Sequence, residues 1–355
     1  MVNYKAKINS QIKNSFFLIF TIKEIRPTIF QMMMLLSFPF FLGVYEVLSQ
    51  TGFTAHVDGA TNLVNIVSGA SLQNFNFVAA GDFSCTDDTK SITSSMISKK
   101  PELILALGDL SYQRTPDCWF NTIAPLDKKN SVKIAIGEHD VDIDTKFTRY
   151  NQYIRHFNLT KPYYSFNYQN VHFLAMATGK QQVIPYDNTS EQYRFVKEDL
   201  IGAHKNKSIS LIIVYSFRPF YSSNTTHPGQ AVLRDNYHPL FDKYGVDIVL
   251  QAHNHNYQRT YPLKYNQNMP ANPIVIDKHL QNYYHPKGPI FVTIGTGGAP
   301  LYNFSSQKPY IVAQFARHGF LNVEVTGNGS NLTATFYDNK EMKDIDRFTM
   351  SLNHK

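Results

Sequence analysis

Short apolar runs alternate along this chain with longer stretches in which apolar residues recur at helical spacing. The runs predict buried strands at Phe75–Asp82, Leu103–Asp109, Val132–Gly137, Leu211–Ser216 and Val246–Gln251. The stretches between them predict helices at about Asp87–Lys99, Asp144–Phe157, Ser190–His204 and Gln230–Tyr244, the last ending at Gly245. Strands that alternate with helices in this way are typical of a βαβ architecture.

A hairpin and a strand-rich tail complete the pattern. The segments YYSFNY and VHFLAMA, separated by Gln169–Asn170, predict a β-hairpin. After residue 251 come mainly strands, in PIVI, PIFVTIG, FLNVEV and LTATFY, the last two joined by Gly-Asn-Gly. We therefore predict an α/β fold, a four-layer sandwich of two mixed β-sheets flanked by helices.

The N-terminal part differs from the rest in charge and hydropathy. Residues 1–26 hold five of the 34 basic residues and one of the 27 acidic ones, and residues 29–45 are uncharged and strongly apolar. This order predicts a signal peptide or a membrane anchor within residues 1–48, with the bulk of the protein outside the cell. We expect a linker at 49–72, one domain at 73–350, and a protein that is secreted or held at the cell surface by residues 29–48.

The remaining charge and the two cysteines narrow the class of protein. Outside residues 1–26 the net charge is only +3 of the total +7, so we expect no nucleic-acid partner. The membrane is a predicted partner only through an uncleaved N-terminal segment. Cys85 and Cys118 both fall in loops at one end of the predicted sheet. They form either a disulfide, as an oxidising compartment allows, or two buried thiols.

Residues of the types that commonly bind metals stand just after the apolar runs. Open α/β sheets place their ligand sites at these carboxyl ends of the strands. The residues are Asp82, Asp109, Tyr112, Glu138, His139, His253 and His255. Carboxylates and imidazoles that converge from separate loops make a metal site. Tyr112 could join it as a phenolate, which requires a strongly Lewis-acidic ion such as Fe(III) because the free phenol has a pKa of about 10.

The order GD…GDxxY…GxH…xRP…HxHxYxR resembles that of the calcineurin-like metallophosphoesterases. GDLSY and AHNHNYQR resemble the purple acid phosphatase branch, and the likeness covers roughly residues 75–335. It implies a dinuclear metal centre of iron with zinc, manganese or a second iron. It also implies a small phosphorylated substrate, and hydrolysis of a phosphate monoester by attack of a metal-bound hydroxide.

The resemblance assigns roles to residues by position. The implied ligands of the first ion are Asp82, Asp109, Tyr112 and His255. Those of the second ion are Asp109, Glu138, His253 and residue 217. His139 would face the substrate and help to protonate the leaving group, and His227 would lie on the loop that holds phosphate. Arg218 is expected either to contact phosphate or to form a salt bridge.

Two departures from the family pattern affect the second ion. Glu138 stands where the family has an asparagine, and Phe217 stands where it has a histidine. A phenyl ring cannot bind a metal, so the sequence leaves open whether a second ion binds. Two hypotheses follow: an exported phosphoesterase, or a cell-surface binding protein on the same fold with one metal ion and little turnover. Four further histidines, His156, His172, His204 and His238, are expected to be ordinary surface or core residues.

Overall fold

The computed structural model describes residues 53–57, 64–68, 74–128, 130–142 and 146–352. The chain divides into two units, Met1–Leu72 and Gln73–Lys355. In the first unit the described strands β1 (Phe53–Val57) and β2 (Val64–Ser68) pair antiparallel, so the segment expected to be a linker contains a small sheet. The signal or anchor predicted within residues 1–48 lies outside the described residues. Every helix in the described part is too short or too polar to cross a membrane.

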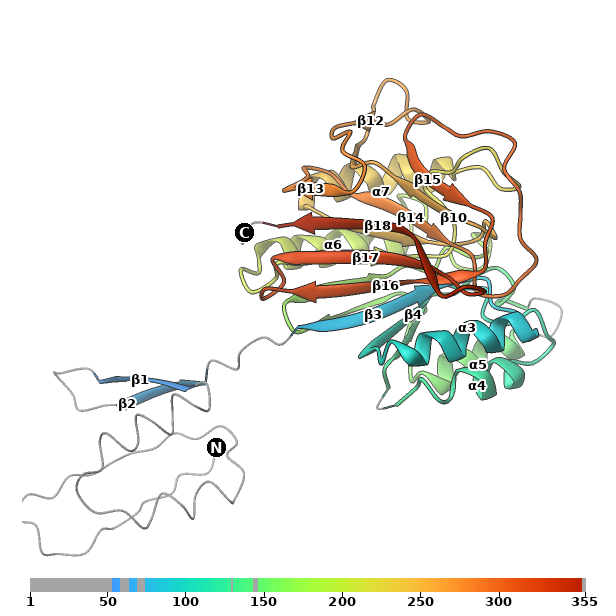
Figure 1. The fold of residues 1–355 in the computed structure, drawn as a ribbon, viewed down its shortest axis with the longest axis horizontal. Coiled ribbons are helices and arrows are strands. Elements are labelled where there is room, and N and C mark those ends of the chain that lie inside the picture. The colour runs from blue at the N-terminus through green and yellow to red at the C-terminus, as the bar shows by residue number, and fades with distance from the viewer. Residues whose placement is uncertain (1–52, 58–63, 69–73, 129, 143–145, 353–355) are drawn as a thin grey trace, which may run out of the picture. The chain divides into compact units, whose positions relative to one another are not determined.

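The second unit is built on two seven-stranded sheets (Figure 1). The first sheet has the spatial order β13 (Asn282–Tyr284), β18 (Lys343–Ser351), β17 (Asn331–Asp338), β16 (Gly319–Thr326), β3 (Phe75–Ala80), β4 (Leu103–Ala106) and β5 (Val132–Ile134). The second has the order β15 (Ile311–Phe315), β10 (Tyr257–Thr260), β14 (Ile290–Ile294), β9 (Ile248–Gln251), β8 (Leu211–Tyr215), β7 (Val171–Ala175) and β6 (Tyr164–Tyr168). Strands β11 (Leu263–Lys264) and β12 (Ile274–Val275) form a separate pair.

Both sheets are mixed, as the sequence predicts. Strands β3, β4 and β5 are parallel, whereas β16 runs antiparallel to β3. Strands β7, β8, β9 and β14 are parallel, whereas β6 and β10 run antiparallel to their neighbours. The predicted hairpin is the pair β6–β7. The carboxyl ends of the parallel strands in each sheet therefore lie at one edge of that sheet.

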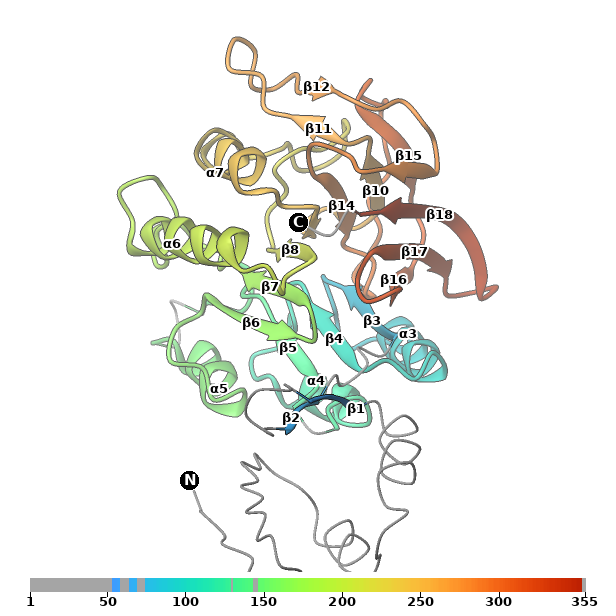
Figure 2. The same ribbon diagram turned by 90° about the vertical axis from the view of Figure 1, so that its left-hand side faces the viewer.

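Helices complete the four layers. They are α3 (Asp87–Ser98), α4 (Asp117–Ile123), α5 (Thr148–His156), α6 (Glu191–Lys205) and α7 (Ala231–Tyr244). Figure 1 shows α3, α4 and α5 beside β3 and β4, and Figure 2 shows α6 and α7 beside β7 and β8. Strand β8 is wholly buried, and its alternate residues face two cores. Ile213 packs in the core between the sheets, whereas Ile212 and Val214 pack in the core beneath α6 and α7.

Local signals in the sequence account for the ends of several helices. Thr86 and Ser190 cap α3 and α6, since each side chain accepts a hydrogen bond from a backbone N–H in the first turn. Gly245 ends α7 in the left-handed conformation, with φ 70°. The helix expected from Asp144 begins instead at Thr148. The carboxylate of Asp142 accepts hydrogen bonds from the N–H groups of Arg149 and Tyr150 in the first turn of this helix.

Three predicted strands end early, and several strands were missed. Strands β3, β4 and β5 end at Ala80, Ala106 and Ile134, because the chain then turns out of their common sheet toward Asp82, Asp109 and Glu138. The apolar pattern does not predict β10, whose sequence is YQRT, or β18, whose sequence is KDIDRFTMS. Their polar residues are placed in sheets by pairing with neighbouring strands and by specific side-chain partners.

One such partnership is a buried ion pair that joins the two sheets. Arg259 on β10 donates to Asp346 on β18 from Nε (2.6 Å) and from Nη2 (2.8 Å). The side chains are 2% and 7% exposed. Tyr257 donates to Asp346 Oδ2 (2.7 Å), and Arg259 Nη1 donates to the hydroxyl of Tyr283 (2.9 Å). With these hydrogen bonds satisfied, the pair fixes the packing of one sheet on the other.

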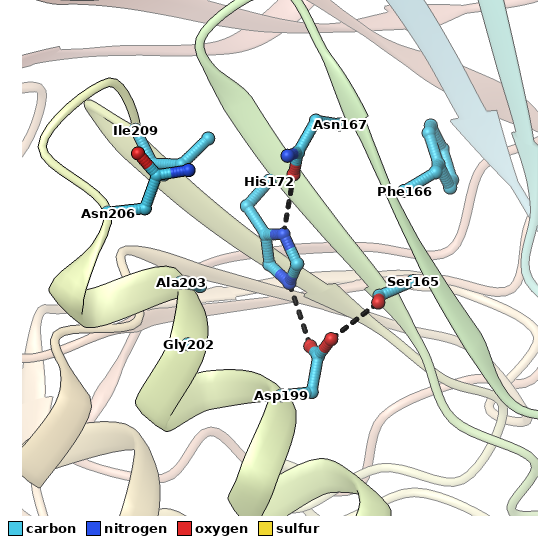
Figure 3. A pocket seen from close by; sticks show the side chains of 9 residues that line it. All are labelled: Ser165, Phe166, Asn167, His172, Asp199, Gly202, Ala203, Asn206 and Ile209. Atoms are coloured by element: carbon cyan, nitrogen blue, oxygen red, sulfur yellow. Dashed lines mark hydrogen bonds and ion pairs between the residues drawn. The ribbon is translucent and has the colours of Figure 1, made fainter.

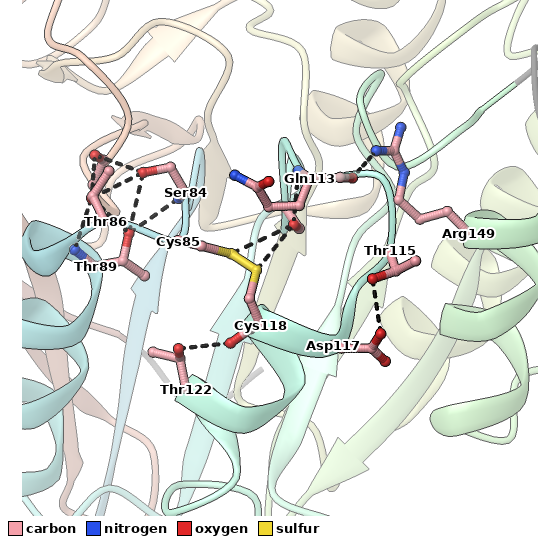
Figure 4. Close-up of a disulfide and its surroundings, with 12 residues drawn as sticks. Ser84, Cys85, Thr86, Thr89, Gln113, Thr115, Asp117, Cys118, Thr122 and Arg149 are labelled. Carbon is pink, nitrogen blue, oxygen red and sulfur yellow. Dashed lines mark hydrogen bonds between the residues drawn. A yellow bond between two sulfur atoms is a disulfide. The ribbon is translucent and has the colours of Figure 1, made fainter.

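A second tie is the disulfide between Cys85 and Cys118, with 6.0 Å between their Cα atoms (Figure 4). It joins the loop after β3 to the first turn of α4. The hydroxyl of Ser111 lies 3.7 Å and 3.6 Å from the two sulfur atoms. Of the two alternatives for these cysteines, the structure contains the disulfide, and it contacts the loop that carries Tyr112.

Replacing Asp346 by asparagine leaves the guanidinium of Arg259 buried without its counter-charge. We expect Asp346→Asn to lower the free energy of unfolding by roughly 3–5 kcal/mol. Asp344→Asn, an exposed change on the same strand, should alter it by less than about 0.5 kcal/mol. Urea denaturation followed by fluorescence measures both, and equal effects would contradict a structural role for the pair.

The disulfide closes a loop with a sequence separation of 33 residues. Restricting the unfolded chain by a loop of this size contributes about 3–4 kcal/mol. We expect the double variant Cys85→Ser, Cys118→Ser to lose about that much stability in the same assay. Dithiothreitol should destabilise the wild type equally and leave the double variant unaffected, because the chain has no other cysteine.

Candidate metal centre

The residues at the strand ends gather in one place, and the backbone there is strained. Asp82, Asp109 and His253 have φ angles of 56°, 48° and 69°. This left-handed region is uncommon for residues other than glycine and costs on the order of 1–3 kcal/mol each. Hydrogen bonds between the loops hold the strained conformations, since Asp82 Oδ2 accepts from the N–H of His253 (2.8 Å). Such strain is a common feature of functional sites.

Glycines let the loops approach each other. A Cβ on Gly137 would lie 2.2 Å from both the backbone N and the Oδ1 atom of Asp109. Gly108 adopts φ 99°, which a side chain would make costly. With Gly137 in place, Asp109 Oδ1 accepts a hydrogen bond from the N–H of His139 (2.8 Å). The loops after β4 and β5 are thereby brought into direct contact.

The four side chains implied for the first ion converge on one point. The hydroxyl of Tyr112 lies 3.3 Å from Asp82 Oδ1, 3.3 Å from Asp109 Oδ2 and 3.0 Å from His255 Nε2. His255 Nε2 is 3.4 Å from Asp82 Oδ1. On the other side of its ring, Nδ1 donates to the carbonyl of Pro300 (2.7 Å), which directs Nε2 toward the centre.

The two buried carboxylates of this group favour the binding of a cation. Asp82 and Asp109 are 0% and 1% exposed. Burial, followed by repulsion from Asp82, holds the pKa of Asp109 well above its usual range, and burial also raises the pKa of Tyr112. Among the described residues, neither aspartate forms an ion pair with a lysine or arginine. Two buried carboxylates with a phenol and an imidazole at one point fit a bound metal ion.

The groups implied for the second ion are arranged differently. Arg218 donates through Nη2 to Glu138 Oε2, and its Nη1 lies 3.4 Å from Nε2 of His253. Phe217 is fully buried, with its ring 4.8 Å from that of His253. Ligand atoms of Asp109, Glu138 and His139 do lie within 4.8 Å of one another. However, Phe217 offers no ligand atom, and Glu138 and His253 both contact Arg218, so these residues do not form the four-ligand set that the resemblance implies for a second ion.

Burial, followed by repulsion from His227 and Arg218, lowers the pKa of His253 to about 2. Its imidazole is therefore neutral in the metal-free protein. In that state the nitrogen atoms can act as one donor and one acceptor, so Nε2 can accept a hydrogen bond from the guanidinium of Arg218.

The two histidines expected to act on the substrate line the same centre. His139 is exposed, and its ring lies 4.4 Å from that of Tyr112. The ring of His227 stacks on that of His253 at 3.9 Å. Partial removal of each ring from water by the surrounding loops lowers the pKa of both His139 and His227. The structure thus brings together all the residues that the sequence suggested for the site.

Several residues that support the site were missed. Asp140 is fully buried and accepts from the N–H groups of Leu110 (2.9 Å) and Gly137 (2.7 Å). Burial raises its pKa to about 6. The position of Asp140 directly after Gly-Glu-His is the feature of the sequence that could have identified it. Asn254 exchanges two hydrogen bonds with the backbone of His227 (2.9 and 2.8 Å) and so holds that histidine in place.

Tyr302 was missed as well, because it lies far along the chain from the motifs. Its ring stacks on His255 at 4.0 Å and an interplanar angle of 10°. This contact fixes the plane of the imidazole. Nothing in the local sequence LYNF distinguishes this tyrosine from the many that pack in the core.

A separate cavity of about 360 Å³ lies at the beginning of β7 rather than at the carboxyl ends of the strands (Figure 3). In it, His172 is held by Asn167 (2.7 Å) and Asp199 (2.8 Å). The hydroxyl of Ser165 donates to Asp199, not to the histidine. A nucleophilic serine needs the histidine as its base, so this cluster is a satisfied structural one. Both ring nitrogens of His172 are thus hydrogen-bonded within the protein.

Comparisons with known proteins agree with this geometry. The family model for calcineurin-like phosphoesterase matches residues 75–257. Purple acid phosphatase 15 of Arabidopsis thaliana is 27% identical over 270 residues, which are 65% of this chain and 46% of that protein. Probable inactive purple acid phosphatase 1 of the same plant is 25% identical over 289 residues, 72% of this chain and 44% of that protein. The chain spans about half the length of these relatives.

Solved structures show the same fold. A purple acid phosphatase from yellow lupin seeds superposes with a TM-score of 0.66 at 20% identity, over 79% of this chain and 54% of that one. GAP50, the anchor in the inner membrane complex of Plasmodium, superposes with a TM-score of 0.59 at 15% identity, over 79% and 89%. With the family match and the gathered ligands, these findings place the chain in the calcineurin-like phosphoesterase family, on its purple acid phosphatase-like branch.

Proposed function

We propose that this chain is an exported, metal-dependent phosphoesterase that hydrolyses small phosphate monoesters. The observation that carries the proposal is the convergence of Asp82, Asp109 and His255 on the hydroxyl of Tyr112. These four side chains would hold an ion, and a tyrosine ligand favours iron at this position. When bound, the ion would supply Lewis acidity, which polarises a phosphoryl oxygen and lowers the pKa of water.

The protein's own residues supply the remaining roles. An imidazole nitrogen of His139, exposed beside Tyr112, would donate a proton to the leaving-group oxygen. His227, stacked on His253 and fixed by Asn254, would orient the phosphate group. The guanidinium of Arg218 lies at the same centre, and its positive charge would stabilise the negative charge of a bound phosphoryl group.

Export is supported by two features of the chain. The basic N-terminus followed by an apolar run at residues 29–45 is typical of a signal or anchor segment. The Cys85–Cys118 disulfide is typical of a protein that folds in an oxidising compartment. We infer a secreted or cell-surface protein, with a small phosphorylated compound rather than a nucleic acid as its ligand.

The alternative function is a binding protein with little turnover. It is favoured by the buried Phe217 and by the pairing of Arg218 with Glu138. The similarity to a relative named a probable inactive purple acid phosphatase points the same way. In this alternative the first ion would be retained, and the site would hold a phosphorylated ligand without cleaving it.

Hydrolysis of p-nitrophenyl phosphate by the purified, metal-loaded chain tests the proposal. We expect measurable turnover in the wild type and a loss of at least roughly 10³-fold in Asp109→Asn, because that change removes charge from an implied ligand of the first ion. Asp235→Asn, an exposed change on α7, is the matched control and should keep full activity.

Two results would contradict the proposal in different ways. Turnover that survives Asp109→Asn would overturn the site assignment. A wild type that binds metal and phosphate but shows no turnover would favour the binding protein instead.

A further inference from the structure

Two groups expected to bind the second ion both contact the side chain of Arg218. Its Nη2 donates to Glu138 Oε2, and its Nη1 lies 3.4 Å from His253 Nε2. The third nitrogen, Nε, donates to the carbonyl of Gly179 (2.8 Å). Each of its three nitrogens thus contacts a group of the protein, which leaves further N–H donors on Nη1 and Nη2, and the guanidinium lies between a carboxylate and an imidazole as a metal cation would.

The backbone beneath Arg218 is fixed as well. Thr178 Oγ1 accepts hydrogen bonds from the N–H groups of Phe217 (3.1 Å) and Arg218 (2.8 Å). Phe217 packs inward against His253, and a Cβ on Gly108 would lie 2.9 Å from its ring. Residue 217 therefore fills space beneath the centre and offers no ligand, while residue 218 is directed into it.

The charges favour the same arrangement. Glu138 adds a carboxylate at a position where the family has a neutral amide, and the guanidinium of Arg218 neutralises it. The side chains of Arg218 and Glu138 are 19% and 27% exposed, so water screens the attraction between them only in part. A divalent ion placed between Glu138 and His253 would meet this guanidinium at close range, and like charges in a partly buried site repel strongly.

We propose that the guanidinium of Arg218 takes the place of the second metal ion. The centre then binds one metal ion, at Asp82, Asp109, Tyr112 and His255, and a phosphate group is held between that ion and Arg218. A planar guanidinium suits this role because its donors match the oxygens of a phosphate. The identity of the ligand rests on the proposed function, whereas the metal count does not.

Metal content of the full chain tests the first half. After removal of metal and reloading with Fe(III) and Zn²⁺, elemental analysis should find one ion per chain in the wild type. Arg218→Gln frees Glu138 and His253, so it should raise the content to two. Arg218→Lys keeps the positive charge and should remain at one, as should the control Arg194→Gln, an exposed change on α6. Two ions in the wild type would overturn the proposal without reference to any variant.

Binding of inorganic phosphate to the metal-loaded protein tests the second half. Titration calorimetry should give a dissociation constant roughly tenfold higher in Arg218→Gln than in the wild type, as expected for loss of a charged hydrogen-bond donor. Arg218→Lys should fall between them, and Arg194→Gln should match the wild type. Equal affinity in Arg218→Gln and the wild type would exclude Arg218 as a phosphate contact.

The outcomes separate this inference from the proposed function. One ion per chain with phosphate binding through Arg218 but without ester hydrolysis would support the inference and overturn the phosphoesterase. Ester hydrolysis by a wild type that holds two ions would support the phosphoesterase and overturn the inference.

A Tyr112→Phe variant tests where the single ion binds. Loss of a visible charge-transfer band in this variant would show that the ion is the one at Asp82, Asp109 and His255, whereas an unchanged band would overturn that placement.

Discussion

The centre depends on how the charge of buried carboxylates is balanced. Removing a carboxylate from water costs several kcal/mol, on the order of the whole net stability of a domain, unless an opposite charge compensates it. Glu138 has its compensation within the protein, in Arg218. Asp82 and Asp109 are more deeply buried, and the described residues provide them with no lysine or arginine. The same centre is therefore satisfied internally in one half and dependent on a bound cation in the other.

The fold holds this arrangement at some cost in backbone strain. Asp82, Asp109 and His253 are kept in left-handed conformations by hydrogen bonds between loops that belong to different sheets. Such strain persists only where the surroundings over-determine it. The Arg259–Asp346 pair locks one sheet on the other, and the disulfide fixes the loop that leads to Tyr112. The rigid scaffold thus holds the four ligand atoms at one point.

The sequence predicts most of the scaffold because its strands are apolar on both faces. Strand β8 could be recognised from LIIVY alone, since alternate residues enter two different cores. Strands β10 and β18 could not, because their polar residues are satisfied by partners from the other sheet, such as Arg259 by Asp346. The supporting residues Asn254 and Tyr302 escaped for a similar reason. Their roles lie in contacts with His227 and His255 that leave no periodic signal.

The sequence by itself determined which ligands the chain offers. The strand-end motifs specify Asp82, Asp109, Tyr112 and His255, and the two departures from the family pattern are visible as Glu138 and Phe217. Only the tertiary structure decided what those departures do. Glu138 and Arg218 are 80 positions apart, and their contact exists because the loops after β5 and β8 are brought together and Thr178 directs Arg218 inward. A motif fixes the chemistry of each side chain, but the path of the backbone decides whether the neighbour of a carboxylate is a metal ion or a guanidinium.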